Sequence, residues 1–102
     1  MILYNVTIIL DESIHQEWLN WMRSEYIPNV MNTGYFVSNR MLKVLDSPNE
    51  GVTYCVQYIA DTHDHLNEFT QKHAADLHSN LPEQFLNKFV LFDTTMEFID
   101  KK

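Results

Sequence analysis

Four segments of the chain carry apolar side chains on both of their faces. A β-strand turns successive side chains to opposite faces, so such runs belong to strands that are covered on both sides. Two helical patterns separate the four segments, which span residues 2–10, 35–45, 52–60 and 89–99. Two helices can cover only one face of a four-stranded sheet, and a large apolar face left open marks an interaction site. The pattern therefore predicts that a second copy of the chain covers the other face, giving a homodimer.

The first helical pattern follows the first strand directly. Asp11 or Ser13 can cap its first turn, and its apolar stripe consists of Ile14, Trp18, Trp21 and Met22. Pro28 is expected to end this helix at about Tyr26, because the residue before a proline is disfavoured in the α-helical region. A short extra turn can follow Pro28, and Gly34 suits its end.

The remaining segments complete a β-α-β-β-α-β order. The second helical pattern runs from Asp61 or Thr62 to about Asn80, and a short helix is expected over residues 82–88. With right-handed crossovers, this order predicts one ferredoxin-like α+β domain over residues 1–102, with an antiparallel sheet of strand order 4-1-3-2 and both helices on one face. The candidates for the face that the helices cover are Tyr4, Val6, Ile8, Tyr54, Val56 and Tyr58.

Charge and composition argue against several kinds of partner and location. Fourteen acidic residues against seven scattered basic ones give a net charge of -7, so nucleic acid and anionic membrane surfaces are poor partners. The N-terminus lacks the basic start of a signal peptide, and no apolar run approaches the roughly 20 residues of a membrane span. The single cysteine, Cys55, has no partner for an internal disulfide. These features predict a cytoplasmic protein.

Several short motifs resemble a small bacterial family that is labelled as a domain of unknown function. They are Tyr4-Asn5-Val6, Trp18-x-x-Trp21-Met22, Ile27-Pro28, Gly34-x-Phe36 and Tyr54-x-x-Gln57-Tyr58. That family is similar to the dimeric α/β-barrel superfamily, whose members pair two ferredoxin-like sheets face to face. The superfamily includes cofactor-independent monooxygenases, haem-degrading enzymes and ligand-binding domains of transcription regulators. The resemblance therefore implies the fold and the dimer, but it does not decide the function.

Glu25 is the residue that fits an apolar helix stripe least well. At 100° per residue it falls within the arc of Trp18, Trp21 and Met22. A carboxylate buried there has a raised pKa, which is typical of general acids and bases, so Glu25 is the candidate catalytic residue. The alternative is that the helix frays before Glu25, or that the carboxylate lies near the N-terminus of the second helix.

A ligand pocket, if the protein has one, is predicted between the first helix and the sheet. Pro28 interrupts the chain there and leaves an irregular edge. The expected lining consists of Trp18, Glu25, Tyr26 and Tyr58, with His73 a more distant candidate; Trp21 and Tyr54 also belong to the aromatic set. The alternative is that these aromatic residues form plain core, and that His73 is a structural histidine.

Other polar residues carry weaker signals. His63 and His65 diverge by about 200° on a helix, so they do not chelate one ion and no metal site is predicted. Arg40, in the middle of a strand, is expected to pair with an acid such as Asp93 or Glu97 across the dimer, with an anionic ligand as the alternative.

Three hypotheses for the function follow. The first is a homodimeric module that binds a small ligand or has a structural role, without cofactor. The second is a cofactor-independent monooxygenase-like or isomerase-like enzyme that acts on a small aromatic or apolar substrate. The third is a haem binder that uses His73 or His15. A cavity near Trp18 and Tyr58 would favour the second hypothesis, because an enzyme of this kind needs room for a substrate; a closed core there would favour the first.

Overall fold

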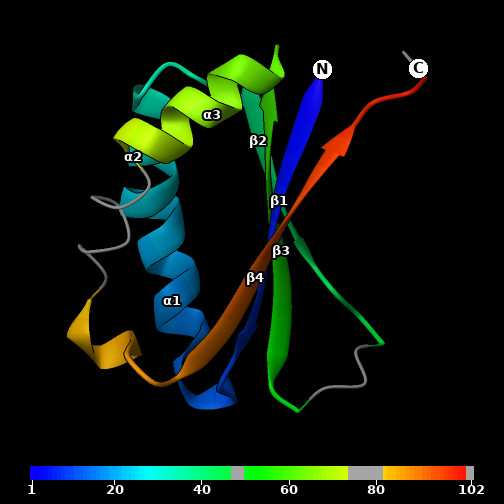
Figure 1. The fold of residues 1–102 in the computed structure, drawn as a ribbon. Helices are drawn as coiled ribbons and strands as arrows, with labels where there is room; N and C mark the ends of the chain where they lie inside the picture. The colour runs from blue at the N-terminus through cyan, green and yellow to red at the C-terminus, as the bar shows by residue number, and fades with distance from the viewer. Residues whose placement is uncertain (47–49, 74–81, 101–102) are drawn as a thin grey trace.

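The computed structural model describes residues 1–46, 50–73 and 82–100 and shows a single four-stranded sheet with helices on one side (Figure 1). The strands are β1 (Ile2–Leu10), β2 (Ser38–Lys43), β3 (Val52–Ala60) and β4 (Phe89–Glu97). The helical elements are η1 (Glu12–Ile14), α1 (His15–Trp21), η2 (Met22–Tyr26), α2 (Ile27–Asn32), α3 (His63–Lys72) and η3 (Glu83–Phe85).

The sheet confirms the predicted ferredoxin-like topology. Its strands lie in the order β2-β3-β1-β4 and all pairs are antiparallel. β1 and β2, which follow each other along the chain, are therefore not neighbours in the sheet. β2 is shorter than the predicted segment 35–45, since ladder pairing begins only at Ser38.

The first helix does not end at Pro28, which corrects the prediction from sequence. Ile27 has φ -62° and ψ -45°, so the residue before the proline is helical. α1 passes without a break through η2, a π-helical turn, into α2; the backbone N–H of Ile27 donates to the carbonyl of Met22, five residues earlier. A regular α-helix would bring the Pro28 ring against the carbonyl of Ser24. We attribute the continuation of the helix to the wider π turn, which precedes the proline and relieves that contact.

The second half of the chain follows the predicted order with different bounds. Thr62 caps α3, because its Oγ1 accepts a hydrogen bond from the backbone N–H of His65 at 3.2 Å. The predicted extension of this helix to about Asn80 lies outside the described residues. The helix expected over residues 82–88 is a single 3₁₀ turn, and Asn87 beyond it has a left-handed φ of 63°.

The core lies between the helices and one face of the sheet, here called the inner face. All six residues expected on that face lie on it, and their neighbours there include Trp18 and Met22 from the first helix and Leu66 and Phe69 from α3. Phe85 from η3 is 1% exposed and closes one end of this layer. The helices cover none of the opposite face, here called the outer face (Figure 1).

Candidate functional site

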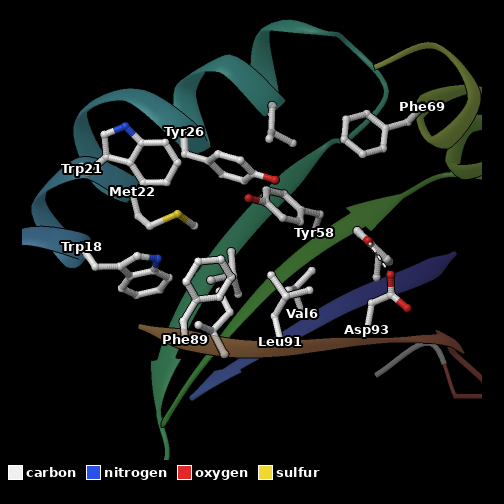
Figure 2. A pocket seen from close by; sticks show the side chains of 14 residues that line it. Val6, Trp18, Trp21, Met22, Tyr26, Tyr58, Phe69, Phe89, Leu91 and Asp93 are labelled. Atoms are coloured by element: carbon white, nitrogen blue, oxygen red, sulfur yellow. Dashed lines mark hydrogen bonds between the residues drawn. The ribbon is translucent and has the colours of Figure 1, made fainter. Parts of the chain in front are cut away.

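A small cavity lies in the core between the first helix and the sheet (Figure 2). Its volume is about 50 Å³. The lining is almost entirely apolar and aromatic, and comes from β1, β3, β4, the first helix and α3: Tyr4, Val6, Ile8, Trp18, Trp21, Met22, Tyr26, Val30, Val56, Tyr58, Phe69, Phe89, Leu91 and Asp93. A site of this kind can bind the apolar body of a small molecule and orient it through the few polar groups present.

Three phenol groups supply most of the polarity of the cavity. Tyr58 is 2% exposed, and its hydroxyl has no hydrogen-bond partner among the described residues. The hydroxyl of Tyr4 donates to Oδ2 of Asp93 at 2.9 Å, and Asp93 is the charged residue of the lining. Figure 2 shows the hydroxyls of Tyr26 and Tyr58 pointing toward one another.

Burial raises the pKa of all three phenols. Desolvation raises the pKa of Tyr58, and the nearby phenols of Tyr26 and Tyr4 raise it further. Desolvation is also the main cause of the raised pKa of Tyr4, with the hydrogen bond to Asp93 and the charge of that carboxylate adding to it. The pKa of Tyr26 is raised by burial. At neutral pH each of the three hydroxyls is therefore a neutral hydrogen-bond donor.

The π turn η2 lies against the cavity. Its first and last residues, Met22 and Tyr26, both belong to the lining. Single π turns inside α-helices are uncommon and occur frequently at functional sites. Figure 2 shows the Met22 side chain between the rings of Trp18 and Trp21. Because methionine is unbranched and flexible, this side chain can change rotamer and alter the volume of the cavity.

Three of the five predicted site residues border the cavity, namely Trp18, Tyr26 and Tyr58. Glu25 does not, and the expectation that its carboxylate is buried is wrong: the residue is exposed. That expectation assumed a rotation of 100° per residue, whereas a π turn rotates less at each residue. Along the turn from Met22, the smaller rotation moves Tyr26 toward the apolar stripe and Glu25 away from it.

His73 also lies outside the lining. It caps the C-terminal end of α3 and is half-buried, with its ring centroid 5.5 Å from that of Tyr35 and 6.2 Å from that of Phe69. Tyr54, from the wider aromatic set, stacks on Trp18 at 5.2 Å outside the cavity, and its hydroxyl lies 3.2 Å from Nδ1 of His15. Neither histidine that was considered for haem therefore borders the cavity.

Sequence reasoning missed the contribution of β1 and β4 to the cavity. Tyr4 and Asp93 meet only because β4 pairs with β1, with Val6 opposite Asp93. A weak signal was present: alternation in β4 places Asp93 on the same face as Phe89 and Leu91. An acid on such an apolar face indicates a polar contact across the sheet.

The outer face combines exposed apolar side chains with one polar row. The exposed fractions of Leu42, Val90, Phe92 and Met96 range from 40% to 64%. Across the middle of the sheet, Nε of Arg40 donates to Oε1 of Gln57 at 2.7 Å, and Nε2 of Gln57 donates to Oδ1 of Asn5 at 3.1 Å. Asn5 in turn donates to Oγ1 of Thr7 at 3.0 Å.

Within one subunit, Arg40 joins this hydrogen-bonded row rather than pairing with an acid. The register places Arg40 opposite Gln57 on the outer face, whereas Asp93 and Glu97 pair with Val6 and Ile2 and lie on the inner face. Asp93 is engaged there by Tyr4. Within one subunit, Arg40 therefore lies on the opposite face of the sheet from both acids, and its pairing with one of them across a dimer stays a prediction.

A second hollow, of about 640 Å³, lies where β1 ends and β4 begins. It is lined by Ile9, Leu10, Asp11, Glu12, Glu50, Gly51, Asn87, Lys88, Phe89 and Val90. Most of these residues are exposed, so the hollow is a solvent-open trough. Over the same described part of the chain, no cluster of three potential metal ligands occurs and no helix has the length and apolarity to cross a membrane.

The sequence as a whole matches a known family model. The model of Domain of unknown function (DUF4286) covers residues 1–99. The chain belongs to this family. No curated protein is significantly similar to it in sequence.

Solved structures similar to this DUF4286 chain share its ferredoxin-like fold. A dimeric ferredoxin-like protein from an uncultured marine organism has a TM-score of 0.72 and 13% identity, over 100% of this chain and 98% of that chain. HapK from Hahella chejuensis has a TM-score of 0.74 and 10% identity, over 100% of this chain and 96% of HapK. SnoaB, a cofactor-independent oxygenase from Streptomyces nogalater, has a TM-score of 0.64 and 12% identity, over 97% of this chain and 94% of SnoaB. At these identities the likeness shows the fold alone.

The unpaired hydroxyl of Tyr58 leads to a stability prediction. Tyr58→Phe is expected to raise the free energy of unfolding by about 1 kcal/mol, because a buried donor without a partner costs about 1–3 kcal/mol. The matched control is Tyr54→Phe, on the same strand and face. It removes a hydroxyl that has His15 as a partner, so it should lower the free energy of unfolding by about 1 kcal/mol. Urea denaturation of both variants measures the difference. Equal destabilisation by the two variants would show that the Tyr58 hydroxyl is satisfied in solution.

Proposed function

We propose that this protein is a homodimer in which two outer faces pack together, and that each subunit binds a small apolar ligand in the cavity between its first helix and its sheet. The observation that carries the binding function is the hydroxyl of Tyr58, which is buried in an aromatic cavity without a partner. The composition of the protein and its single cysteine support a cytoplasmic location. The resemblance of its motifs to a bacterial family supports a bacterial source.

The charge distribution supports the dimer. Alternation along the paired strands gives the outer face the side chains of Leu3, Asn5, Thr7, Ile9, Ser38, Arg40, Leu42, Thr53, Cys55, Gln57, Ile59, Val90, Phe92, Thr94 and Met96. None of these is acidic, although the chain has 14 acidic residues and a net charge of -7. Two such chains repel each other through their acidic side chains, and this face contributes none of those side chains.

The size of the face also suits a stable dimer. Nine-residue strands in a four-stranded sheet cover roughly 30 Å by 19 Å, or about 570 Å² before side-chain relief is counted. Two such faces bury about 1,100 Å² in total, which exceeds the roughly 1,000 Å² that a specific interface needs. Hydrogen bonds connect the side chains of Arg40, Gln57 and Asn5 into one row. Arg40 uses one of its five N–H donors in this row, so the other donors can add specificity to an otherwise apolar contact with a partner.

Binding is favoured over catalysis as the role of the cavity. The enzyme hypothesis depended on a buried acid at Glu25, which is exposed. The acid that does border the cavity, Asp93, accepts a hydrogen bond from Tyr4 and so is positioned to fix the phenol. The monooxygenase-like and isomerase-like alternative stays a hypothesis in which Asp93 takes the place of Glu25. The haem hypothesis named His73 and His15, and neither of them borders the cavity.

The volume of the cavity sets the first binding test. A cavity of roughly 150 Å³ holds one benzene ring, about three times the volume present here. Met22→Ala should therefore convert weak binding of toluene into binding at least about 10-fold tighter, while lowering the free energy of unfolding by about 2–5 kcal/mol. The chain has two Trp residues, Trp18 and Trp21, and both line the cavity, so their indole N–H resonances report occupancy directly.

The control is Met31→Ala, which makes the same truncation farther along the same helix and outside the lining. It should leave the toluene affinity unchanged. If Met22→Ala and Met31→Ala change the affinity equally, or if toluene shifts neither indole resonance in the Met22 variant, the cavity is not a binding site.

A further inference from the structure

The polar groups of the cavity select the kind of ligand that fits it. Tyr58 offers an unused hydroxyl at its interior, and Tyr4 has committed its hydrogen to Asp93. Among the described residues, the lining contains no Lys, Arg or His. A ligand therefore meets a hydrogen-bond donor inside the cavity and a carboxylate beside it, without a cation to neutralise an acidic group.

The direction of the hydrogen bond from Tyr58 follows from its surroundings. A phenol that stays protonated can donate its hydrogen, and the Tyr58 hydroxyl forms no hydrogen bond with a described residue, although the Tyr26 hydroxyl points toward it. A ligand atom that accepts this hydrogen bond removes the cost of the unpaired donor, whereas an apolar ligand leaves the cost in place. The cavity is therefore matched to a molecule with an acceptor oxygen on an apolar body.

The charge of the ligand is limited by the same residues. A carboxylate or phosphate bound here would lose its hydration without gaining a cationic partner. It would also approach the Asp93 carboxylate, which adds repulsion of like charges. The aromatic side chains of the lining, such as those of Trp18, Trp21 and Phe89, suit a flat molecule.

We propose that the ligand of this cavity is a small, flat, uncharged molecule whose carbonyl oxygen accepts a hydrogen bond from the hydroxyl of Tyr58. This inference rests on the proposed binding function and narrows it to a class of ligand. Three structural facts carry it: the buried hydroxyl without a partner, the aromatic walls, and a lining whose charged residue is an acid.

The test compares two probes of nearly the same shape. Acetophenone carries a carbonyl oxygen where α-methylstyrene carries a CH₂ group, so the pair matches in shape and differs in the acceptor oxygen and its hydration. Titration into the Met22→Ala protein, followed by the indole resonances of Trp18 and Trp21, should give an affinity for acetophenone about 3–10-fold higher than for α-methylstyrene. Benzoate, of similar size and negatively charged, should not bind at millimolar concentration.

Adding Tyr58→Phe to the Met22→Ala protein isolates the group responsible. The double variant should bind acetophenone about 3–10-fold more weakly than the parent and bind α-methylstyrene equally or more tightly. Asp93→Asn in the same parent should allow benzoate to bind detectably. Equal affinities for the two neutral probes, unchanged by Tyr58→Phe, would overturn the inference while leaving the binding site intact. Failure of both neutral probes to bind would remove the binding function itself.

Discussion

Replacing Phe92 with Asp is expected to convert the protein from a dimer to a monomer. Phe92 lies on the outer face opposite Thr7 and is 53% exposed in the single chain. Two-fold symmetry places two copies of the new carboxylate in one interface, and each buried charge without a partner costs several kcal/mol. A cost of about 2 kcal/mol per copy already raises the dissociation constant by roughly 1,000-fold. The fold of the subunit should be retained, because the substituted position is half-exposed.

Light scattering at micromolar concentration measures the outcome. The unaltered protein should scatter with twice the chain mass of 12.1 kDa, and the variant with that mass itself. The matched control is Thr95→Asp, which adds the same charge to the same strand at an exposed position on the inner face, opposite Tyr4. It should remain dimeric. A monomeric unaltered protein would refute the dimer, and a dimeric Phe92→Asp variant would place the contact on another surface.

The fold could be predicted from sequence because its determinants are local. Alternation in β1 and β3 fixes which side chains share a face, and the antiparallel register pairs Tyr4 with Tyr58 and Val6 with Val56 as that alternation requires. The order of elements and the handedness of crossovers then leave few topologies. These signals repeat over many residues, so one local irregularity does not disturb them.

The candidate site was only partly predictable, because it depends on one irregular turn. Trp18, Tyr26 and Tyr58 lie around the cavity as the aromatic pattern suggested. A single shift from α to π hydrogen bonding moved Glu25 out to the surface and allowed Pro28 to remain within the helix. Composition indicates neither change, since the same residues are compatible with a regular helix that ends before the proline.

Contacts between segments distant in sequence explain the remaining differences. Tyr4 and Asp93 are 89 residues apart, and Arg40 finds Gln57 rather than an acid because of the β2–β3 register. A cavity is the space left after all side chains are packed, so no single segment determines it. For that reason the sequence predicted the aromatic lining but neither the volume of about 50 Å³ nor the unpaired hydroxyl of Tyr58.

Replacing Gly51 with Ala is expected to lower the free energy of unfolding by about 3 kcal/mol. Gly51 has φ +89°, a left-handed conformation that favours glycine, just before β3 begins. A Cβ atom there would overlap the carbonyl oxygen of Leu10 and lie 3.3 Å from its carbonyl carbon. Both atoms belong to the backbone at the end of β1, where Leu10 pairs with Val52, so relief requires the end of the ladder to move.

Gly34→Ala is the matched control for this change, because it separates backbone strain from the clash. Gly34 has nearly the same left-handed φ, +82°, but a Cβ atom there meets no atom within 4 Å. Gly34→Ala should therefore lower the free energy of unfolding only by the conformational penalty of about 1–2 kcal/mol. In a domain of this size each kcal/mol shifts Tm by about 4–8 °C, so the two variants should be separated clearly in thermal unfolding followed by circular dichroism. Equal losses in both variants would mean that the Leu10 carbonyl moves away freely, and that the end of β1 is not held rigidly against the turn before β3.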